Sequence, residues 1–400
     1  MHATLYIIMN KIITIILSLL VLIIIPSCGL DEPENRPGHT RRTVLIYAVA
    51  SNNLQHDLVS DKAEMVMAAP DVAGLGSDVR VLLYSVPSQK ATEATLSELT
   101  KSKSGIWEFS DIRTYSRDVF STDPGRISEV IGDVAELSPS DSYGLVFWSH
   151  GTGWIPNFSD HQVPEPSGLK KSYGMDKYGD ATDYCDIDEL ASAIPDDMFD
   201  YIWFDLCYMM GIEVAYELRN KCDYVAGYPT EDWSQGMNYE STLPMLAAVK
   251  PDLAGAAASF FDYYNSRNMA VTVTVASTSG LERLADAAAA LYASGRRPLS
   301  PDGMQNYSRL RTGLYDFGQF TKAWGDSDSP EDAVRIDVFE KALDDVVVFA
   351  ACSEKDFNGR YAFDPEEYSG FSCHFPGSAG VAVEKYYSSC LDWPKATGLH

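Results

Sequence analysis

Two short apolar segments place the tightest constraint on how this chain folds. Residues 144–147 and 201–204 are short runs with aromatic and β-branched side chains, a pattern typical of buried strands rather than helices. His150 follows the first run and Cys207 follows the second. Because ligands bind where the parallel strands of an open α/β sheet end, the sequence predicts a histidine and a cysteine together at one sheet edge.

Strand-like and helix-like segments alternate along most of the chain. Strands are predicted at residues 43–49, 79–84, 224–227 and 270–275, and helices at residues 52–69, 123–137, 187–194, 208–221 and 243–265. Pro70 is expected to end the first helix, and Asp123 to cap the second one just before Pro124. Repeated strand–helix–strand units imply an α/β fold with a mostly parallel central sheet and helices on both faces.

Three regions have a less regular pattern. Residues 108–119 are expected to form a hairpin or edge strands, and residues 152–186 a polar, Gly-rich loop. From about residue 280 onward, the sequence predicts helices at 281–294 and 330–349 and a strand leading into a turn at 371–376. This C-terminal part either completes the same domain or forms a small appendage.

The composition is that of an acidic globular protein. Of the 400 residues, 46% are hydrophobic and 22% are charged, and the formal net charge is -26, which is ordinary for a folded chain except for the charge. Nucleic-acid phosphates repel so acidic a chain, so no nucleic-acid partner is expected. The charge would attract basic peptides if it lines a cleft; the simpler alternative is that most of it maintains solubility. A monomer is the favoured oligomeric state.

The N-terminus has the pattern of an export signal. Lys11 precedes an apolar run at residues 12–25, and a short segment leads from it to Cys28, as in a secretory signal peptide. The run is shorter than the ~20 residues of a comfortable transmembrane helix. Its ending resembles a bacterial lipobox, in which the cysteine becomes the lipidated first residue. Pro26 departs from the usual residue there, and an ordinary signal peptide with a chance Cys28 is the alternative.

This pattern divides the chain into three parts. Residues 1–27 are expected to be a lipoprotein signal peptide, residues 28–40 a flexible acidic tether, and residues 41–400 the folded domain. The expected location is the bacterial cell envelope. There the protein would be lipid-anchored in the outer membrane through Cys28, facing either the periplasm or the cell surface.

Six cysteines follow Cys28, and none of them belongs to a Cys-x-x-Cys pair. Zinc ribbons and thioredoxin-like redox motifs are therefore not expected. Disulfide bonds are possible in an exported protein. A chain of this size does not need them, however, and most of these cysteines are expected to be buried thiols.

His150 and Cys207 have the chemistry of a catalytic pair. A cysteine nucleophile needs an imidazole to hold its thiolate and to protonate the leaving amine, and a helix starting near Met209 would lower the pKa of the thiol further. Gly151 and Gly153 would allow a ligand to approach the backbone closely, and the Gly151 N–H could point at a developing oxyanion. The alternative for Cys207 is a small buried hydrophobe.

Several blocks of the sequence resemble the clostripain-like cysteine peptidases. Residues 150–154, His-Gly-Thr-Gly-Trp, resemble the family's His-Gly-x-Gly-Trp block, and residues 204–209 resemble its Asp-Ala-Cys-x-Met block. Leu206 in place of Ala and Tyr208 in place of Leu are departures that remove no reactive atom. The similarity continues at residues 44–48, 51–54, 213–218, 236–239 and 368–376, and so covers nearly the whole chain after the tether.

The resemblance implies a caspase-like three-layer α/β sandwich and a cysteine endopeptidase that cuts after Arg or Lys. His150 would be the general acid and base and Cys207 the nucleophile, with no third residue required. Asp205 would lie in the S1 pocket, where a buried guanidinium needs carboxylate partners. The loop after the next strand would supply a second acid, with Glu231 preferred and Asp232 as the alternative. The alternative for Asp205 is that it only orders this loop.

The resemblance also bears on cofactors and processing. The chemistry requires no cofactor, and calcium is suggested by the family alone, because no EF-hand-type spacing is present. Some clostripain relatives cut themselves between the two dyad residues. In that stretch this chain has Lys170, Lys171 and Lys177, which are the candidate self-processing sites, and a merely flexible surface loop is the alternative.

Two functions follow from these expectations. The first is an exported endopeptidase whose partners are peptides or proteins with basic residues. The second is a catalytically inactive surface lipoprotein that keeps the caspase-like fold in order to bind peptides or other partners. Retention of the dyad and of its neighbouring glycines favours the enzyme.

Overall fold

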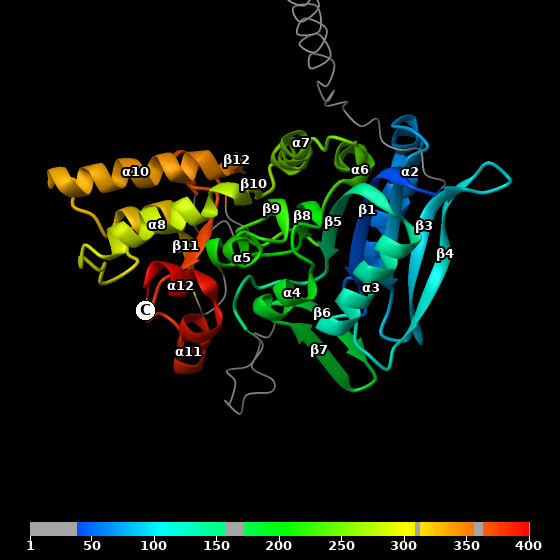
Figure 1. Cartoon of the computed structure of the whole chain (residues 1–400), viewed down its shortest axis with the longest axis horizontal. Coiled ribbons are helices and arrows are strands. Elements are labelled where there is room, and N and C mark those ends of the chain that lie inside the picture. Colours follow the sequence, from blue (N-terminus) through cyan, green and yellow to red (C-terminus); the bar gives the residue numbers. More distant parts are fainter. Residues whose placement is uncertain (1–37, 157–171, 309–312, 356–362, 400) are drawn as a thin grey trace, which may run out of the picture. The chain divides into compact units, whose positions relative to one another are not determined.

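A nine-stranded mixed sheet is the centre of the fold. The computed structural model describes residues 38–156, 172–308, 313–355 and 363–399, and within them the sheet has the strand order β12-β10-β9-β8-β5-β1-β2-β3-β4 (Figure 1). Its strands are β1 (Thr40–Val49), β2 (Val79–Val86), β3 (Glu93–Lys101), β4 (Trp107–Ser116), β5 (Ser140–Trp148), β8 (Phe199–Asp205), β9 (Cys222–Gly227), β10 (Thr272–Ser277) and β12 (Val347–Cys352).

The helices and two small sheets make up most of the remaining described structure. One small sheet is the hairpin β6 (Tyr173–Tyr178) and β7 (Ala181–Cys185), and the other pairs β11 (Leu314–Asp316) with β13 (Ser372–His374). The helices are α2 (Gln55–Gly74), α3 (Pro124–Leu137), α4 (Ile187–Ala193), α5 (Ile212–Glu217), α6 (Tyr239–Ala247), α7 (Leu253–Asn265), α8 (Leu281–Tyr292), α9 (Phe317–Lys322), α10 (Pro330–Val346), α11 (Val381–Cys390) and α12 (Asp392–Thr397).

Five adjacent strands of the sheet run parallel, in the order β9, β8, β5, β1 and β2. Antiparallel strands extend this central part at both edges, β10 and β12 on one side and β3 and β4 on the other. The predicted mostly parallel centre is therefore confirmed. The strand predicted at residues 270–275 is also present, as β10, but it runs against β9.

Alternate residues of β1 face two separate cores. Leu45 and Tyr47 pack on one side with side chains of α3, α4, α5 and α8. Ile46 and Ala48 pack on the other side with side chains of α2, α6 and α7. Burial on both faces is typical of a parallel strand covered by helices on either side, and Figure 1 shows the two helical layers flanking the sheet. The predicted three-layer α/β arrangement is thus confirmed.

The two helix-end predictions had different outcomes. Asp123 caps α3 as predicted, because its side chain accepts hydrogen bonds from the backbone N–H groups of Gly125 and Arg126. The prediction that Pro70 ends the first helix is wrong, since α2 continues to Gly74. Pro70 removes one helical hydrogen bond, but Val72 beyond it is buried in the core, and this packing holds the last turn in place.

Several predicted boundaries change because of local chemistry that the pattern alone did not reveal. The helix predicted at 243–265 is two helices, because Pro251 disfavours a helical residue before it and Asp252 then caps α7. The helix predicted at 330–349 ends at Val346, and the chain continues as β12 at the sheet edge. The predicted loop at 152–186 contains the β6–β7 hairpin.

Some predictions fall outside the described residues. These are the signal peptide, most of the tether, Cys28, Lys170 and Lys171. In the parts of the chain that the structure describes, no helix is both long and apolar enough to cross a membrane.

Candidate active site

The ends of β5 and β8 bring His150 and Cys207 into the same region. These neighbouring parallel strands pair in a register that sets Trp148 opposite Asp205. His150 lies two residues beyond Trp148, and Cys207 lies two residues beyond Asp205. Adjacent strands are about 4.8 Å apart, so the two residues lie at matched positions on adjacent loops.

Glycines let the backbones of the two loops approach each other very closely. A Cβ atom on Gly151 would lie 2.6 Å from the carbonyl oxygen of Cys207, and a Cβ atom on Gly153 would lie 2.7 Å from that of Tyr208. Gly153 also has a φ of +69°, which favours glycine. On the side where a Cβ would point, the space beside these glycines is therefore filled by the loop that carries Cys207 rather than open to a ligand.

The sulfur of Cys207 lies against the loop that follows β9. The backbone N–H of Asp232 donates to Sγ at 3.3 Å, and Sγ is 3.8 Å from the Asp232 carbonyl oxygen. A donated N–H favours the thiolate over the thiol. Cys207 is partly exposed, as a nucleophile must be.

The prediction of a helix starting near Met209 is wrong. Tyr208 has a φ of +64°, and the N–H groups of Tyr208 and Met210 donate to the carbonyl oxygens of Thr230 and Tyr228. These bonds draw the chain across the end of β9, and α5 begins only at Ile212. The dipole of α5 therefore does not act directly on Cys207, and the Asp232 N–H donates to the sulfur.

His150 contacts a residue that sequence reasoning did not single out. Its Nε2 lies 2.9 Å from Oδ1 of Asn53, in the loop that follows β1. Asn53 lies within residues 51–54, which resemble the clostripain-like family, but the sequence predicted no role for it. The two residues are 97 positions apart, so no local pattern could have paired them.

The β6–β7 hairpin fixes the backbone on either side of Gly151. Gly151 and Tyr173 form an antiparallel bridge, in which the N–H of Gly174 donates to the His150 carbonyl and the N–H of Thr152 donates to the Ser172 carbonyl. The two hydrogen bonds of this bridge are made by groups on either side of Gly151 and Tyr173. The N–H of Gly151 itself therefore takes no part in the bridge.

A buried ion pair anchors the hairpin to the loop that carries Asn53. Asp176 is fully buried and pairs with the buried side chain of Arg117. The same carboxylate accepts hydrogen bonds from the Ser51 hydroxyl at 2.6 Å and the Ser121 N–H at 2.6 Å. The network thus joins the loop after β1, the hairpin and the segment before α3.

Replacing Asp176 with Asn is expected to destabilise the fold by about 3–5 kcal/mol, because it leaves the Arg117 charge buried without its partner. Urea unfolding monitored by circular dichroism measures the change. Asp337→Asn is the matched control: it breaks an exposed pair with Lys341 on α10 and should cost under about 1 kcal/mol. Equal effects of the two variants would contradict this account.

Asp205 lies buried at the end of β8, only 4% exposed. Its carboxylate accepts hydrogen bonds from the hydroxyls of Tyr228 and Tyr239, at 3.1 and 2.8 Å, and from the Met237 N–H at 3.0 Å. Burial raises its pKa above the ordinary value, and these donors oppose the rise. The geometry shows that Asp205 does order the loop between β9 and α6.

More carboxylates surround Asp205. Burial raises the pKa of Asp232 well above its ordinary value, and the charge of Asp205 raises it further. Burial and the Asp205 charge also raise the pKa of Asp61 on α2 to about 9, and burial raises the pKa of Glu64. Within the described residues, no Lys or Arg pairs with Asp205 or Asp232. The cluster is therefore a group of buried carboxyl groups in which burial and neighbouring charges oppose ionisation and no cation of the described chain offsets them.

The remaining predicted site residues have distinct surroundings. Glu231 is partly exposed, and its carbonyl accepts a hydrogen bond from the Thr230 hydroxyl. Lys177 belongs to β6, where it pairs with Thr182, and its N–H donates to the Ser51 carbonyl. Of the six described cysteines, all are free thiols and four are buried, which agrees with the prediction of mostly buried thiols.

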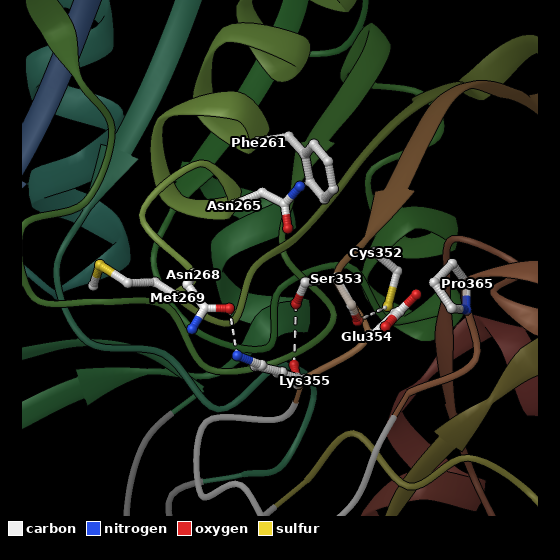
Figure 2. Close-up of a pocket in the computed structure, with 9 residues that line it drawn as sticks. All are labelled: Phe261, Asn265, Asn268, Met269, Cys352, Ser353, Glu354, Lys355 and Pro365. Atoms are coloured by element: carbon white, nitrogen blue, oxygen red, sulfur yellow. Dashed lines mark hydrogen bonds between the residues drawn. The ribbon is translucent and has the colours of Figure 1, made fainter.

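A cavity of about 270 Å³ lies farther along the same sheet edge (Figure 2). Cys352 lines it at the end of β12, opposite Thr272. The Lys355 ammonium donates to the Asn268 side chain on its rim. In the described part of the chain, no three His, Cys, Asp or Glu side chains gather closely enough to hold a metal ion.

A mostly parallel α/β sheet with a thiol and an imidazole on adjacent strand-end loops is the arrangement of the caspase-like cysteine peptidases. Comparison with known families agrees with this class. The profile of the clostripain family, Peptidase_C11, matches residues 46–397, and the chain belongs to this family. Peptidases of this kind need no cofactor for their chemistry.

Solved structures of family members resemble the chain over nearly all of its length. A secreted C11 cysteine protease from Bacteroides thetaiotaomicron, in complex with an irreversible peptide inhibitor, has 25% identity and a TM-score of 0.75, with 90% of this chain and 100% of that one covered. An inactive zymogen C11 protease from Parabacteroides distasonis has 27% identity and a TM-score of 0.73, with coverage of 90% and 98%. No curated protein matches the chain significantly.

Proposed function

We propose that this protein is an exported cysteine endopeptidase that cuts peptide bonds after Arg or Lys. Cys207 is the nucleophile and His150 the general acid and base. The observation that carries the proposal is the matched placement of the two residues, each two positions beyond the paired strand residues Trp148 and Asp205. Family membership supports the peptidase class.

The reaction proceeds through a thioester. The Cys207 thiolate attacks the carbonyl carbon of the scissile bond, and the C–N bond breaks as His150 gives its proton to the leaving amine. A water molecule then attacks the thioester while His150 accepts a proton from it. The carboxylic acid product leaves, and the thiolate–imidazolium pair is restored.

Gly151 is the proposed oxyanion donor. Its N–H lies outside the bridge to Tyr173, and its backbone is packed against the Cys207 carbonyl. An N–H next to the nucleophile can donate to the negative oxygen that develops during attack. The position of Gly151 next to His150, packed against the loop that carries Cys207, supports this role.

Asp205 and Asp232 are the proposed partners of the substrate cation. Burial raises the cost of ionising both, and the charge of Asp205 adds to that cost for Asp232. An Arg or Lys side chain between them would relieve the cost. Support is stronger for Asp232 than for Glu231, because the backbone of Asp232 contacts Cys207 and its carboxylate interacts with Asp205. Asp205 would then both pair with the substrate cation and order the loop between β9 and α6.

Hydrolysis of fluorogenic peptides tests the proposal. Peptides that differ only in having Arg, Lys, Asp or Leu before the scissile bond are compared under reducing conditions, with and without calcium. Turnover of the Arg and Lys peptides alone is expected. Turnover only after another residue would overturn the roles of the two aspartates, and no turnover by folded protein, even after cleavage between residues 152 and 186, would favour a peptide-binding protein.

Self-processing after Lys170 or Lys171 is the proposed route to the active form. The relative described as an inactive zymogen supports a precursor state. Lys177 is less suited, because its N–H and carbonyl are both bound, to Ser51 and to Arg117. Cleavage there would require the hairpin to open first.

The double variant Lys170→Ala/Lys171→Ala is expected to stay a single chain, while Lys177→Ala is cut like the wild type. Denaturing electrophoresis and mass spectrometry of the purified proteins measure this. An active wild-type preparation that remains one intact chain would contradict the processing proposal, as would cleavage of the double variant at the wild-type rate.

A lipid on Cys28 is the proposed anchor, and the secreted state of a relative supports export. The variant Cys28→Ser is expected to move from the detergent phase to the aqueous phase in a phase-partition assay, because the acyl chains supply the membrane affinity. Mass spectrometry of the wild-type N-terminus identifies the lipid. Equal partition of both proteins would exclude the anchor.

A further inference from the structure

We infer that Asn53 is a positioning residue that fixes the tautomer of His150. The inference rests on the proposed dyad and adds a third residue to it. By accepting a hydrogen bond from Nε2–H, the Asn53 amide oxygen makes Nδ1 the nitrogen that exchanges a proton with Cys207.

The contact has the geometry that this role needs. Oδ1 of Asn53 lies 2.9 Å from Nε2 of His150, which is an ordinary N–H···O distance. In a neutral imidazole one nitrogen carries the proton and the other accepts, and the bond made by one nitrogen decides which is which. An amide oxygen accepts from Nε2–H in both the neutral and the protonated ring, so the contact survives each proton transfer in the cycle.

Buried hydrogen bonds fix the residues on either side of Asn53. The side-chain amide of Asn52 donates to the carbonyls of Val49 and Met175, at 3.0 and 2.8 Å, and its oxygen accepts from the Leu54 N–H at 2.8 Å. Ser51, on the other side, donates to the buried Asp176. These bonds fix the backbone around Asn53, although its own side chain is exposed.

The hairpin couples this loop to the histidine itself. Met175, whose carbonyl binds Asn52, is adjacent to Gly174, whose N–H binds the His150 carbonyl. The Ser149 hydroxyl donates to the Val49 carbonyl at 2.8 Å. The backbones that carry Asn53 and His150 are therefore held by the same strand, β6, which sets the distance between their side chains.

Nitrogen-15 NMR tests the tautomer without any need for turnover. Histidine-labelled protein with Cys207→Ala is examined above the pKa of the ring, and the His150 signals are assigned by comparison with a His150→Gln variant. The proton is expected on Nε2, and a mixture of tautomers is expected after Asn53→Ala. A proton on Nδ1, or no change in Asn53→Ala, would overturn the inference.

Kinetics on Arg peptides give the second readout. Asn53→Ala is expected to lower kcat by about 10²-fold with little change in KM, because a misplaced catalytic group costs about that much. Asn53→Asp keeps an acceptor and should stay within about tenfold of the wild type. Its carboxylate favours the imidazolium, so the alkaline limb of the kcat/KM profile should move to higher pH.

The matched control is Gln55→Ala, which removes an amide side chain at the start of α2 and should leave the kinetics and the pH profile unchanged. Unfolding temperatures of all variants confirm that the fold is intact. If Asn53→Ala hydrolyses the Arg peptides with the wild-type kcat and pH profile, Asn53 has no positioning role. If the wild type cleaves no peptide, the proposed function fails instead, and the NMR result still decides the role of Asn53.

Discussion

Replacing Cys207 with alanine is expected to lower kcat for Arg peptides by about 10⁴–10⁶-fold, because the variant cannot form the thioester and retains only what binding and the oxyanion donor contribute. The measurement is hydrolysis of the fluorogenic Arg peptide by the processed protein, with titration of the reactive thiol to count active molecules. The main-chain bonds from Tyr208 and Met210 to the loop after β9 do not involve the sulfur, so its removal should leave the backbone of both loops in place.

Cys390→Ala is the matched control, because Cys390 is the other partly exposed thiol of the described chain and ends α11. Its activity should equal that of the wild type. Comparable loss in both variants would point to a general effect of removing a thiol. Full activity in Cys207→Ala would remove Cys207 from the reaction and with it the proposed mechanism.

Replacing Asp205 with asparagine is expected to lower kcat/KM for Arg and Lys peptides by about 10²–10³-fold, since truncating one partner of a buried charge pair costs about 2–5 kcal/mol. The effect should be far smaller for a peptide with neutral citrulline in place of arginine. Asp223→Asn is the control, because Asp223 lies near the start of β9, at the opposite edge of the sheet.

The same carboxylates give the reaction a defined pH dependence. Burial raises the pKa of Asp205 to about 6, and burial together with the charge of Asp205 raises the pKa of Asp232 well above its ordinary value. As the pH falls through these raised values the carboxylates become neutral, and their attraction for a guanidinium is lost. KM for Arg peptides is therefore expected to rise with acidification at a pH above the ordinary aspartate pKa of about 3.9, while KM for citrulline peptides stays flat.

An equal loss with Arg and citrulline peptides in Asp205→Asn would show that Asp205 acts only by ordering the loop through Tyr228 and Tyr239. That alternative is real, because the hydrogen bonds that Asp205 accepts from Tyr228, Met237 and Tyr239 all come from this loop or from its ends. Comparing two peptides of the same shape separates the role in charge recognition from the role in loop order.

Local patterns were sufficient to predict the strand ends and the α3 cap. The runs at 144–147 and 201–204 lie within β5 and β8, because a strand buried on both faces must be apolar throughout. Asp123 caps α3 because the residues it binds are its own neighbours. In each case the information needed lies within a few residues of the feature.

Features that depend on contacts with remote segments could not be predicted from local sequence patterns. The left-handed conformation of Tyr208 is accompanied by bonds to carbonyls of the β9 loop, and these bonds replaced the predicted helix. The direction of β10 and the contact between Asn53 and His150 likewise depend on how remote segments meet. The family resemblance was sufficient to predict His150 and Cys207 as the catalytic pair, but the contact of Asn53 with His150 became visible only in the structure.

The strand order has a consequence for the cut protein. Strands β1 to β5 form one continuous side of the sheet, and β8, β9, β10 and β12 form the other, so a break after Lys170 or Lys171 divides the sheet along the seam between β5 and β8. His150 then belongs to one polypeptide and Cys207 to the other. After full denaturation, restoring the site would become a bimolecular reaction that depends on protein concentration. The uncut chain would be the form that folds, and how long the mature enzyme persists would be set by its rate of unfolding.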